Sequence, residues 1–100
     1  MYNIKFIVRE NKPNRFFYIS KMTDINVEYP HDFNIARLIN IDLNIYRSIL
    51  ETEFNSDLRN KEFCKDPYFF GISKFSSKHD AQRAVDWINS TILMNRLGID

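Results

Sequence analysis

The sequence predicts a single α+β domain, in which a small and mostly antiparallel sheet packs against a long C-terminal helix and a short helix pair. Apolar and polar residues alternate in the N-terminal part of the chain, which is typical of strands. The apolar spacing becomes helical in residues 35–54 and again in residues 78–97. No repeat, low-complexity tract or linker divides the 100 residues, so the domain is expected to span residues 1–100. The expected order is β-β-(β)-α-α-β-α.

The first two strands are expected at residues 2–9 and 15–22. Residues 10–14 (ENKPN) between them suit a turn, because proline fixes φ and asparagine tolerates unusual φ values. An antiparallel hairpin is therefore the simplest arrangement. Residues 25–29 add a short edge strand, which Pro30 stops.

Two short helices are expected next, at residues 35–39 and 43–54. Either Asp32 or Asn34 would cap the first helix, and Asp42 would cap the second, because short polar side chains accept hydrogen bonds from first-turn N–H groups. These helices would close one end or one side of the sheet.

The C-terminal third reads as a strand at residues 68–75 that leads directly into a helix at residues 78–97. Ser77 lies three residues before Asp80, so its hydroxyl can accept an N–H of the first turn while the carboxylate favours the positive helix end. Gly98 follows the helix, where a left-handed cap residue is favoured. The apolar face of this helix is formed by Ala81, Ala84, Val85, Ile88 and Ile92.

Composition narrows the class of protein. Apolar residues make up 44% of the chain and aromatic residues 15%, which argues against a disordered chain. The net charge of +1 gives no global field that would recruit nucleic acid or anionic lipid. No apolar run reaches the roughly 18 residues of a membrane helix, so we expect no membrane partner. Cys64 is the only cysteine and is compatible with a reducing compartment, so a cytoplasmic location is expected.

Few side chains suggest catalysis or metal binding. His31 and His79 are far apart in sequence, and neither has the spacing to Cys64 that a zinc site needs. Two glycines are too few for a phosphate-binding loop. We therefore expect no enzyme activity, no catalytic residues, no cofactor and no metal.

The most specific local pattern is residues 35–50, which resemble a helix-turn-helix. Asn40 suits the left-handed turn and Asp42 the cap of the second helix. If this helix entered a DNA major groove, Asn44 and Arg47 would be the residues able to read bases. Three acidic residues on or beside the same helix would face phosphates, so the competing interpretation is a compact helix pair that buries its own seam.

Basic residues gather on the predicted hairpin, with aromatic residues interleaved. Such a surface can bind a partner, whereas the competing interpretation is that the cations prevent edge-to-edge pairing and the aromatic rings belong to the core. Trp87, beside the apolar face of the last helix, suits either the core or an interface. The polar segment 55–67 is a second possible contact surface. The residues expected to bind a partner are Lys5, Arg9, Lys12, Arg15, Tyr18 and Trp87.

The chain is also similar in style to small proteins of phages and prophages from A/T-rich bacterial hosts. Isoleucine and asparagine are abundant and alanine is rare, and the chain is short, aromatic-rich and without catalytic motifs. This group includes host-takeover factors and anti-CRISPR inhibitors, which bind and occlude a host enzyme. The resemblance implies a non-enzymatic binding protein that acts on a host protein or nucleoprotein. The sequence leaves open whether the protein is a monomer or a homodimer, and an exposed aromatic face would favour the dimer. The alternative is a DNA-binding regulator that uses residues 35–50.

Overall fold

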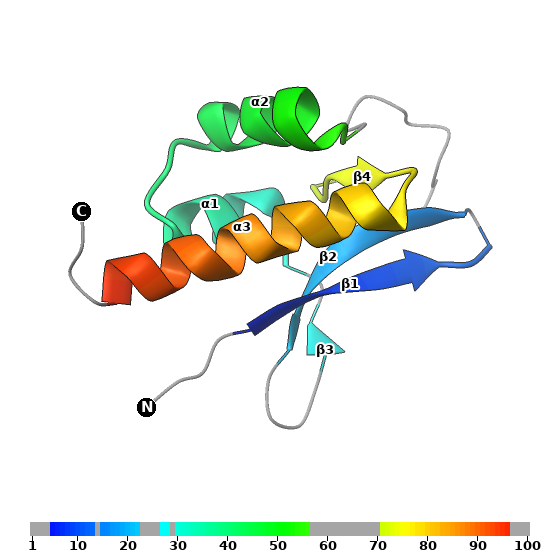
Figure 1. The fold of residues 1–100 in the computed structure, drawn as a ribbon, viewed down its shortest axis with the longest axis horizontal. Helices are drawn as coiled ribbons and strands as arrows, with labels where there is room; N and C mark the ends of the chain where they lie inside the picture. Colours follow the sequence, from blue (N-terminus) through cyan, green and yellow to red (C-terminus); the bar gives the residue numbers. More distant parts are fainter. Residues whose placement is uncertain (1–4, 14, 23–26, 29, 57–70, 97–100) are drawn as a thin grey trace.

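The chain folds as the α+β domain that the sequence predicts (Figure 1). The computed structural model describes residues 5–13, 15–22, 27–28, 30–56 and 71–96. Its elements, in chain order, are β1 (Lys5–Asn11), β2 (Phe16–Met22), β3 (Val27–Glu28), α1 (Asp32–Leu38), α2 (Leu43–Phe54), β4 (Lys74–Phe75) and α3 (Lys78–Arg96).

Strand β2 is the centre of an antiparallel sheet. It pairs with β1 along its whole length, from Asn11 opposite Phe16 to Lys5 opposite Met22. Its other edge pairs with β4 at one end and with β3 at the other. The predicted hairpin is confirmed, although β1 continues two residues further than expected and makes the turn shorter. The predicted edge strand at residues 25–29 is present at residues 27–28, and its other residues lie outside the described ranges.

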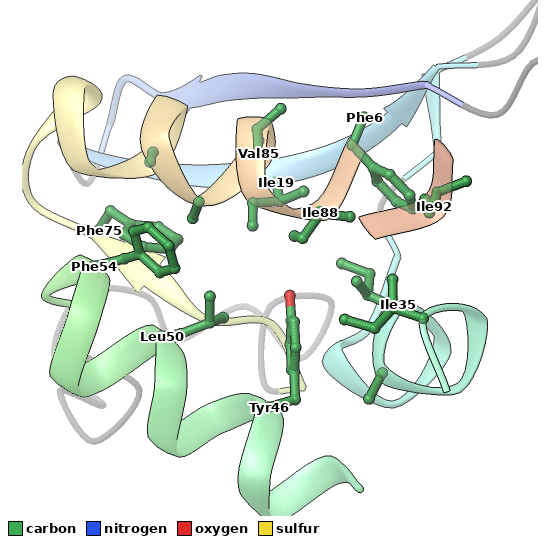
Figure 2. Packing of buried hydrophobic residues seen from close by; sticks show 14 residues of the cluster. Phe6, Ile19, Ile35, Tyr46, Leu50, Phe54, Phe75, Val85, Ile88 and Ile92 are labelled. Atoms are coloured by element: carbon green, nitrogen blue, oxygen red, sulfur yellow. The ribbon is translucent and has the colours of Figure 1, made fainter. Parts of the chain in front are cut away.

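The main core lies between the sheet and the helices (Figure 2). Figure 2 shows side chains of all three helices converging on the sheet residues Phe6 and Ile19. Phe6 and Val8 therefore mark the face of β1 that packs against α3. The predicted apolar face of α3 is confirmed, since its five residues Ala81, Ala84, Val85, Ile88 and Ile92 are buried in this core.

The opposite face of the sheet also contains a buried cluster. Phe16 and Tyr18 pack there with Ile72, and their rings are 5.9 Å apart between centroids. The sequence left open whether this face keeps an exposed aromatic patch. For Phe16 and Tyr18 it does not, because both rings are buried.

The connection between α1 and α2 follows the local signals in the sequence. Asn40 adopts a left-handed conformation with φ of 60°, and the N–H of Ile41 donates to the carbonyl of Ala36 at 2.9 Å. The Asp42 carboxylate accepts the N–H of Asn44 at 2.9 Å, which confirms the predicted cap of α2.

The predicted cap of α1 is wrong. Helix α1 begins at Asp32, earlier than expected, and His31 occupies the cap position without a side-chain hydrogen bond to the helix. The Asp32 side chain instead turns toward Ser73, where it accepts two hydrogen bonds. A buried tertiary partner has displaced the local capping interaction.

The predicted strand at residues 68–75 is also corrected. Residues 71–73 are not a strand, and only Lys74 and Phe75 pair with β2, while residues 68–70 lie outside the described ranges. The carbonyl of Gly71 accepts the N–H of Asp32 at 2.8 Å, so α1 takes the place of a neighbouring strand here. A Cβ atom at Gly71 would overlap Cδ2 of His31, so a larger residue here would require the His31 ring to move.

Helix α3 begins as predicted. The Ser77 hydroxyl accepts the N–H of Asp80 at 3.3 Å, and the helix continues to Arg96. Gly98 lies outside the described residues.

Tyr46 is expected to stabilise the fold less than phenylalanine would. Its hydroxyl is buried without a hydrogen-bond partner in the part of the chain that the structure describes. Burial raises the pKa of Tyr46 well above its ordinary value of 10.0, with a smaller contribution from Asp32. Because Tyr46→Phe removes a buried, unpaired hydroxyl, it should raise the free energy of unfolding by about 1 kcal/mol. Urea denaturation at neutral pH, followed by circular dichroism, measures this change.

A loss of stability in Tyr46→Phe would show that the hydroxyl has a partner. A second readout separates the two cases in alkali. The folded state keeps the Tyr46 proton to higher pH than the unfolded state, so its contribution to stability is lost as pH rises above 10.0. The phenylalanine variant should lack this loss.

Candidate functional site

Four exposed basic side chains lie on the hairpin of β1 and β2, and we name them the hairpin cations: Lys5, Arg9, Lys12 and Arg15. Lys5 and Arg9 alternate with Phe6 and Val8, so they project from the face opposite α3. Lys12 and Arg15 lie in and beside the turn, and Figure 1 shows this turn extending beyond the N-terminal end of α3. None of the four forms an ion pair with an acidic side chain in the described ranges.

Positive charge is concentrated on the hairpin, while the rest of the chain is net negative. Residues 5–22 hold five basic side chains and one acidic one, a net charge of +4. The rest of the chain holds nine basic and twelve acidic side chains, a net charge of −3. The fifth basic residue of the hairpin, Lys21, differs from the hairpin cations because its Nζ lies 3.8 Å from the Glu28 carboxylate. The net charge of the whole chain is small because the positive hairpin and the negative remainder nearly cancel.

Two aromatic residues expected at the binding surface are less accessible than the cations. Tyr18 is directly opposite Arg9 in the hairpin register and on the same face of the sheet, but it is only 3% exposed. Trp87 is half-buried on α3, and its ring stacks on that of Tyr46 with centroids 6.2 Å apart. The ring of Phe54, which lies on α2 with Tyr46, has its centroid 5.7 Å from that of Trp87. The core interpretation of Trp87 therefore accounts for its contacts.

The second predicted contact surface, residues 55–67, is described only at its start. Asn55 ends α2 in a left-handed conformation, and Ser56 forms an isolated bridge with Phe75. The remaining residues of this segment lie outside the described ranges, so their part in binding stays a prediction.

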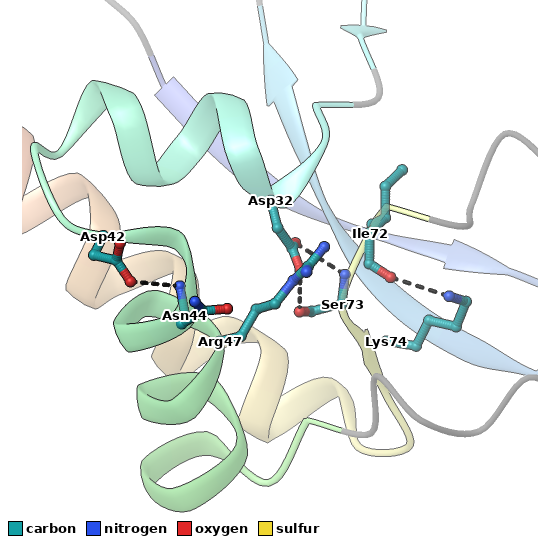
Figure 3. A network of polar contacts seen from close by, with 7 residues as sticks. All are labelled: Asp32, Asp42, Asn44, Arg47, Ile72, Ser73 and Lys74. Atoms are coloured by element: carbon teal, nitrogen blue, oxygen red, sulfur yellow. Dashed lines mark hydrogen bonds and ion pairs between the residues drawn. The ribbon is translucent and has the colours of Figure 1, made fainter.

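The clearest polar network is buried and centres on Asp32 (Figure 3). The Ser73 N–H donates to Oδ1 of Asp32 at 3.0 Å, and the Ser73 hydroxyl donates to Oδ2 at 2.6 Å. Arg47 Nε donates to the same Oδ2 at 3.2 Å. One carboxylate thus joins the start of α1, the middle of α2 and the segment before β4.

The geometry of this network suits stabilisation of the fold, because its carboxylate and hydroxyl are buried away from any substrate. Asp32 and Ser73 are each 2% exposed, and the serine hydroxyl is committed to the carboxylate. Burial raises the pKa of Asp32, and the hydrogen bonds from Ser73 and Arg47 oppose this effect only in part. A nucleophilic serine needs an exposed hydroxyl beside a free base, and this arrangement supplies neither among these three residues.

Arg47 is the residue on which the DNA-binding alternative depends. Its side chain is 30% exposed, and its Nε is held by Asp32. Asn44, the other predicted base reader, is exposed near the start of α2. For Arg47 to contact a base, its Nε would have to leave a buried carboxylate, which costs several kcal/mol. The DNA-binding interpretation stays a prediction, with one of its two residues already engaged.

Lys74 is the other buried charge near this network. Its Nζ donates to the carbonyl of Ile72 at 3.0 Å and lies 6.0 Å from the centroid of the Phe16 ring. No pattern in the sequence singles out Ser73 or Lys74, because both lie in a segment that reads as an ordinary strand.

Two further classes of site can be stated for the described ranges. Within them, no three histidine, cysteine, aspartate or glutamate side chains gather closely enough to hold a metal ion. No helix in the same ranges is both long and apolar enough to span a membrane.

Comparisons of the chain with family models, with curated proteins and with solved structures found no match. The function is therefore inferred from the residues themselves. Of the two polar features, the hairpin cations are exposed on the surface and the Asp32 carboxylate is buried.

Proposed function

We propose that this chain is a non-enzymatic binding protein of mobile-element origin that acts on a host protein or nucleoprotein through the hairpin cations. The observation that carries the proposal is the exposure of four basic side chains without an acidic partner among the described residues. A surface of this kind attracts an acidic partner and speeds encounter with it.

Two features support binding over catalysis. Lys5 and Arg9 lie on a strand that is paired along its length, so their spacing is largely set before a partner arrives and less entropy is lost on binding. The buried groups Asp32 and Tyr46 and the partly exposed Arg47 are engaged with one another or with the core. Size and composition resemble those of phage and prophage inhibitors, which supports an anti-CRISPR-like or host-takeover role.

Reversing two hairpin charges should strongly weaken partner binding. Arg9→Glu with Lys12→Glu changes the net charge from +1 to −3 and places repulsive charge on the surface that an acidic partner would approach. The immobilised protein is exposed to lysate of an A/T-rich bacterial host, and retained proteins are identified by mass spectrometry. The affinity of the purified partner should fall about tenfold or more in the variant.

The matched control reverses two exposed charges away from the hairpin. Arg37→Glu with Lys78→Glu gives the same net charge of −3 but leaves the hairpin unchanged, so it should retain the partner. Equal retention by both double variants, or retention that survives about 0.5 M salt, would contradict the proposal. Nuclease treatment of the lysate shows whether the partner contains nucleic acid.

A further inference from the structure

The side chain of Asn89 pairs with the outer edge of β1 as a neighbouring strand would. Its Oδ1 accepts the N–H of Phe6 at 3.1 Å, and its Nδ2 donates to the carbonyl of Phe6 at 3.2 Å. Asn89 is on α3, which lies beside β1 (Figure 1). The carboxamide of Asn89 therefore occupies the outer hydrogen-bonding groups of one residue, Phe6.

The geometry of an antiparallel ladder determines which other residues of β1 turn their backbone groups toward this outer edge. Residues of an antiparallel strand turn their N–H and C=O groups alternately to one neighbour and to the other. Since Phe6 faces outward to Asn89, Val8 and Glu10 also face outward, whereas Ile7 and Arg9 face β2. No strand in the described ranges pairs with the outer edge at Val8 or Glu10.

The side chains around Val8 and Glu10 indicate what kind of segment would pair with their outward-facing backbone groups. Arg9 lies between Val8 and Glu10, and with Lys5 it presents positive charge on the face opposite α3. Val8, on the other face, is partly buried against the core and offers an apolar contact. Acidic and apolar side chains in alternation match these two faces of the edge.

We propose that an extended acidic segment of the partner adds to β1 as an antiparallel strand at Val8 and Glu10, with Asn89 marking the end of the open edge. This inference rests on the proposed function and specifies its binding mode. Backbone hydrogen bonds supply affinity, and the alternating side chains supply specificity. Acidic residues of the segment face Lys5 and Arg9, and apolar residues lie beside Val8.

Amide hydrogen exchange measured by NMR tests the edge directly. In the free protein, the N–H groups of Ile7 and Arg9 should exchange slowly, and those of Val8 and Glu10 should exchange rapidly. The probe is a capped peptide of three Glu-Val repeats. On its addition, exchange at Val8 and Glu10 should slow by about tenfold or more. Failure of the peptide to bind, or binding that leaves these two amides unprotected, would overturn the proposal.

Methylated peptides separate strand addition from simple charge attraction. In the antiparallel arrangement, the valine N–H groups of the peptide face β1 and the glutamate N–H groups face away. N-methylation of the valines should therefore abolish binding, whereas N-methylation of the glutamates should preserve it. Equal binding of both peptides would show that charge alone holds the segment, and a Lys-Val peptide should not bind.

A pair of variants at Glu10 makes the same distinction in the protein. Glu10→Pro removes an outward-facing N–H and leaves the hydrogen bonds between β1 and β2, since proline is tolerated at such edge positions. Glu10→Ala removes the same carboxylate but keeps the N–H. The proline variant should lose peptide affinity about tenfold or more, while the alanine variant should bind as well as the natural chain.

The two proposals fail in different ways. If the natural partner still binds Glu10→Pro but not the Arg9 and Lys12 charge reversal, strand addition is wrong and the binding function stands. If the charge reversal has no effect on the partner, the proposed binding surface is wrong as well.

Discussion

Replacing Asp32 by alanine should lower the free energy of unfolding by about 3 kcal/mol. The carboxylate accepts hydrogen bonds from the Ser73 N–H, the Ser73 hydroxyl and Arg47 Nε. Alanine would leave the buried Ser73 donors unpaired and the guanidinium without its counterion. Chemical denaturation followed by circular dichroism, with Asp42→Ala as a comparison, measures the loss. Asp42 caps α2 from an exposed position, so its replacement should cost only about 1 kcal/mol.

Asparagine at position 32 tests the charge of this residue separately from its shape. The pKa of Asp32 is raised above 3.8, so the folded state holds the proton more tightly than the unfolded state. The part of the stability that comes from holding this proton is therefore complete below pH 3.8 and is lost as pH rises through the raised pKa. The Asp32→Asn variant lacks this loss, so its stability relative to the natural chain should increase with pH. A relative decrease would mean that Arg47 and Ser73 outweigh burial.

Replacing Phe75 by alanine should lower the free energy of unfolding by about 4 kcal/mol. Phe75 is fully buried in the main core, faces Phe17 across the sheet and bridges to Ser56. Its loss would leave a cavity where β4, β2 and the end of α2 meet. Phe33 provides the control, because it is 56% exposed on α1 and Phe33→Ala should change stability by no more than about 0.5 kcal/mol. Similar losses in both variants would contradict this account of the core.

The elements predicted correctly are those whose signals lie within a few residues of one another. The start of α3 depends on Ser77 and Asp80, and the turn before α2 on Asn40 and Asp42. The alternation around Phe6 likewise gave the hairpin. In these segments, local hydrogen bonds and apolar spacing agree with the final packing.

The wrong predictions arose where a distant residue replaced a local interaction. Asp32 looked like a helix cap, but Ser73, which is 41 residues away, takes its carboxylate. The apolar run before Phe75 looked like one long strand, but α1 bonds to its Gly71. No spacing in the sequence distinguishes these outcomes.

For the candidate binding surface, the sequence predicted which residues carry the charge, but not the burial of the aromatic residue or the strand edge left open among the described residues. The four hairpin cations are exposed, whereas the burial of Tyr18 depends on the opposite face of the sheet being covered. The role of Asn89 was missed, although one signal existed. It is a polar residue one turn from Val85, at the edge of the apolar face of α3, and a partly buried polar side chain at such a position needs a hydrogen-bond partner.

The stacking of Trp87 on Tyr46 gives this small protein its own optical reporter. Trp87 is the only tryptophan, and it belongs to α3 while the two rings beside it, those of Tyr46 and Phe54, belong to α2. Its indole fluorescence therefore responds to the separation of these two helices, whereas circular dichroism averages over all of them. Emission that changes before the helical signal would reveal undocking of α2 as a distinct step, without any attached dye.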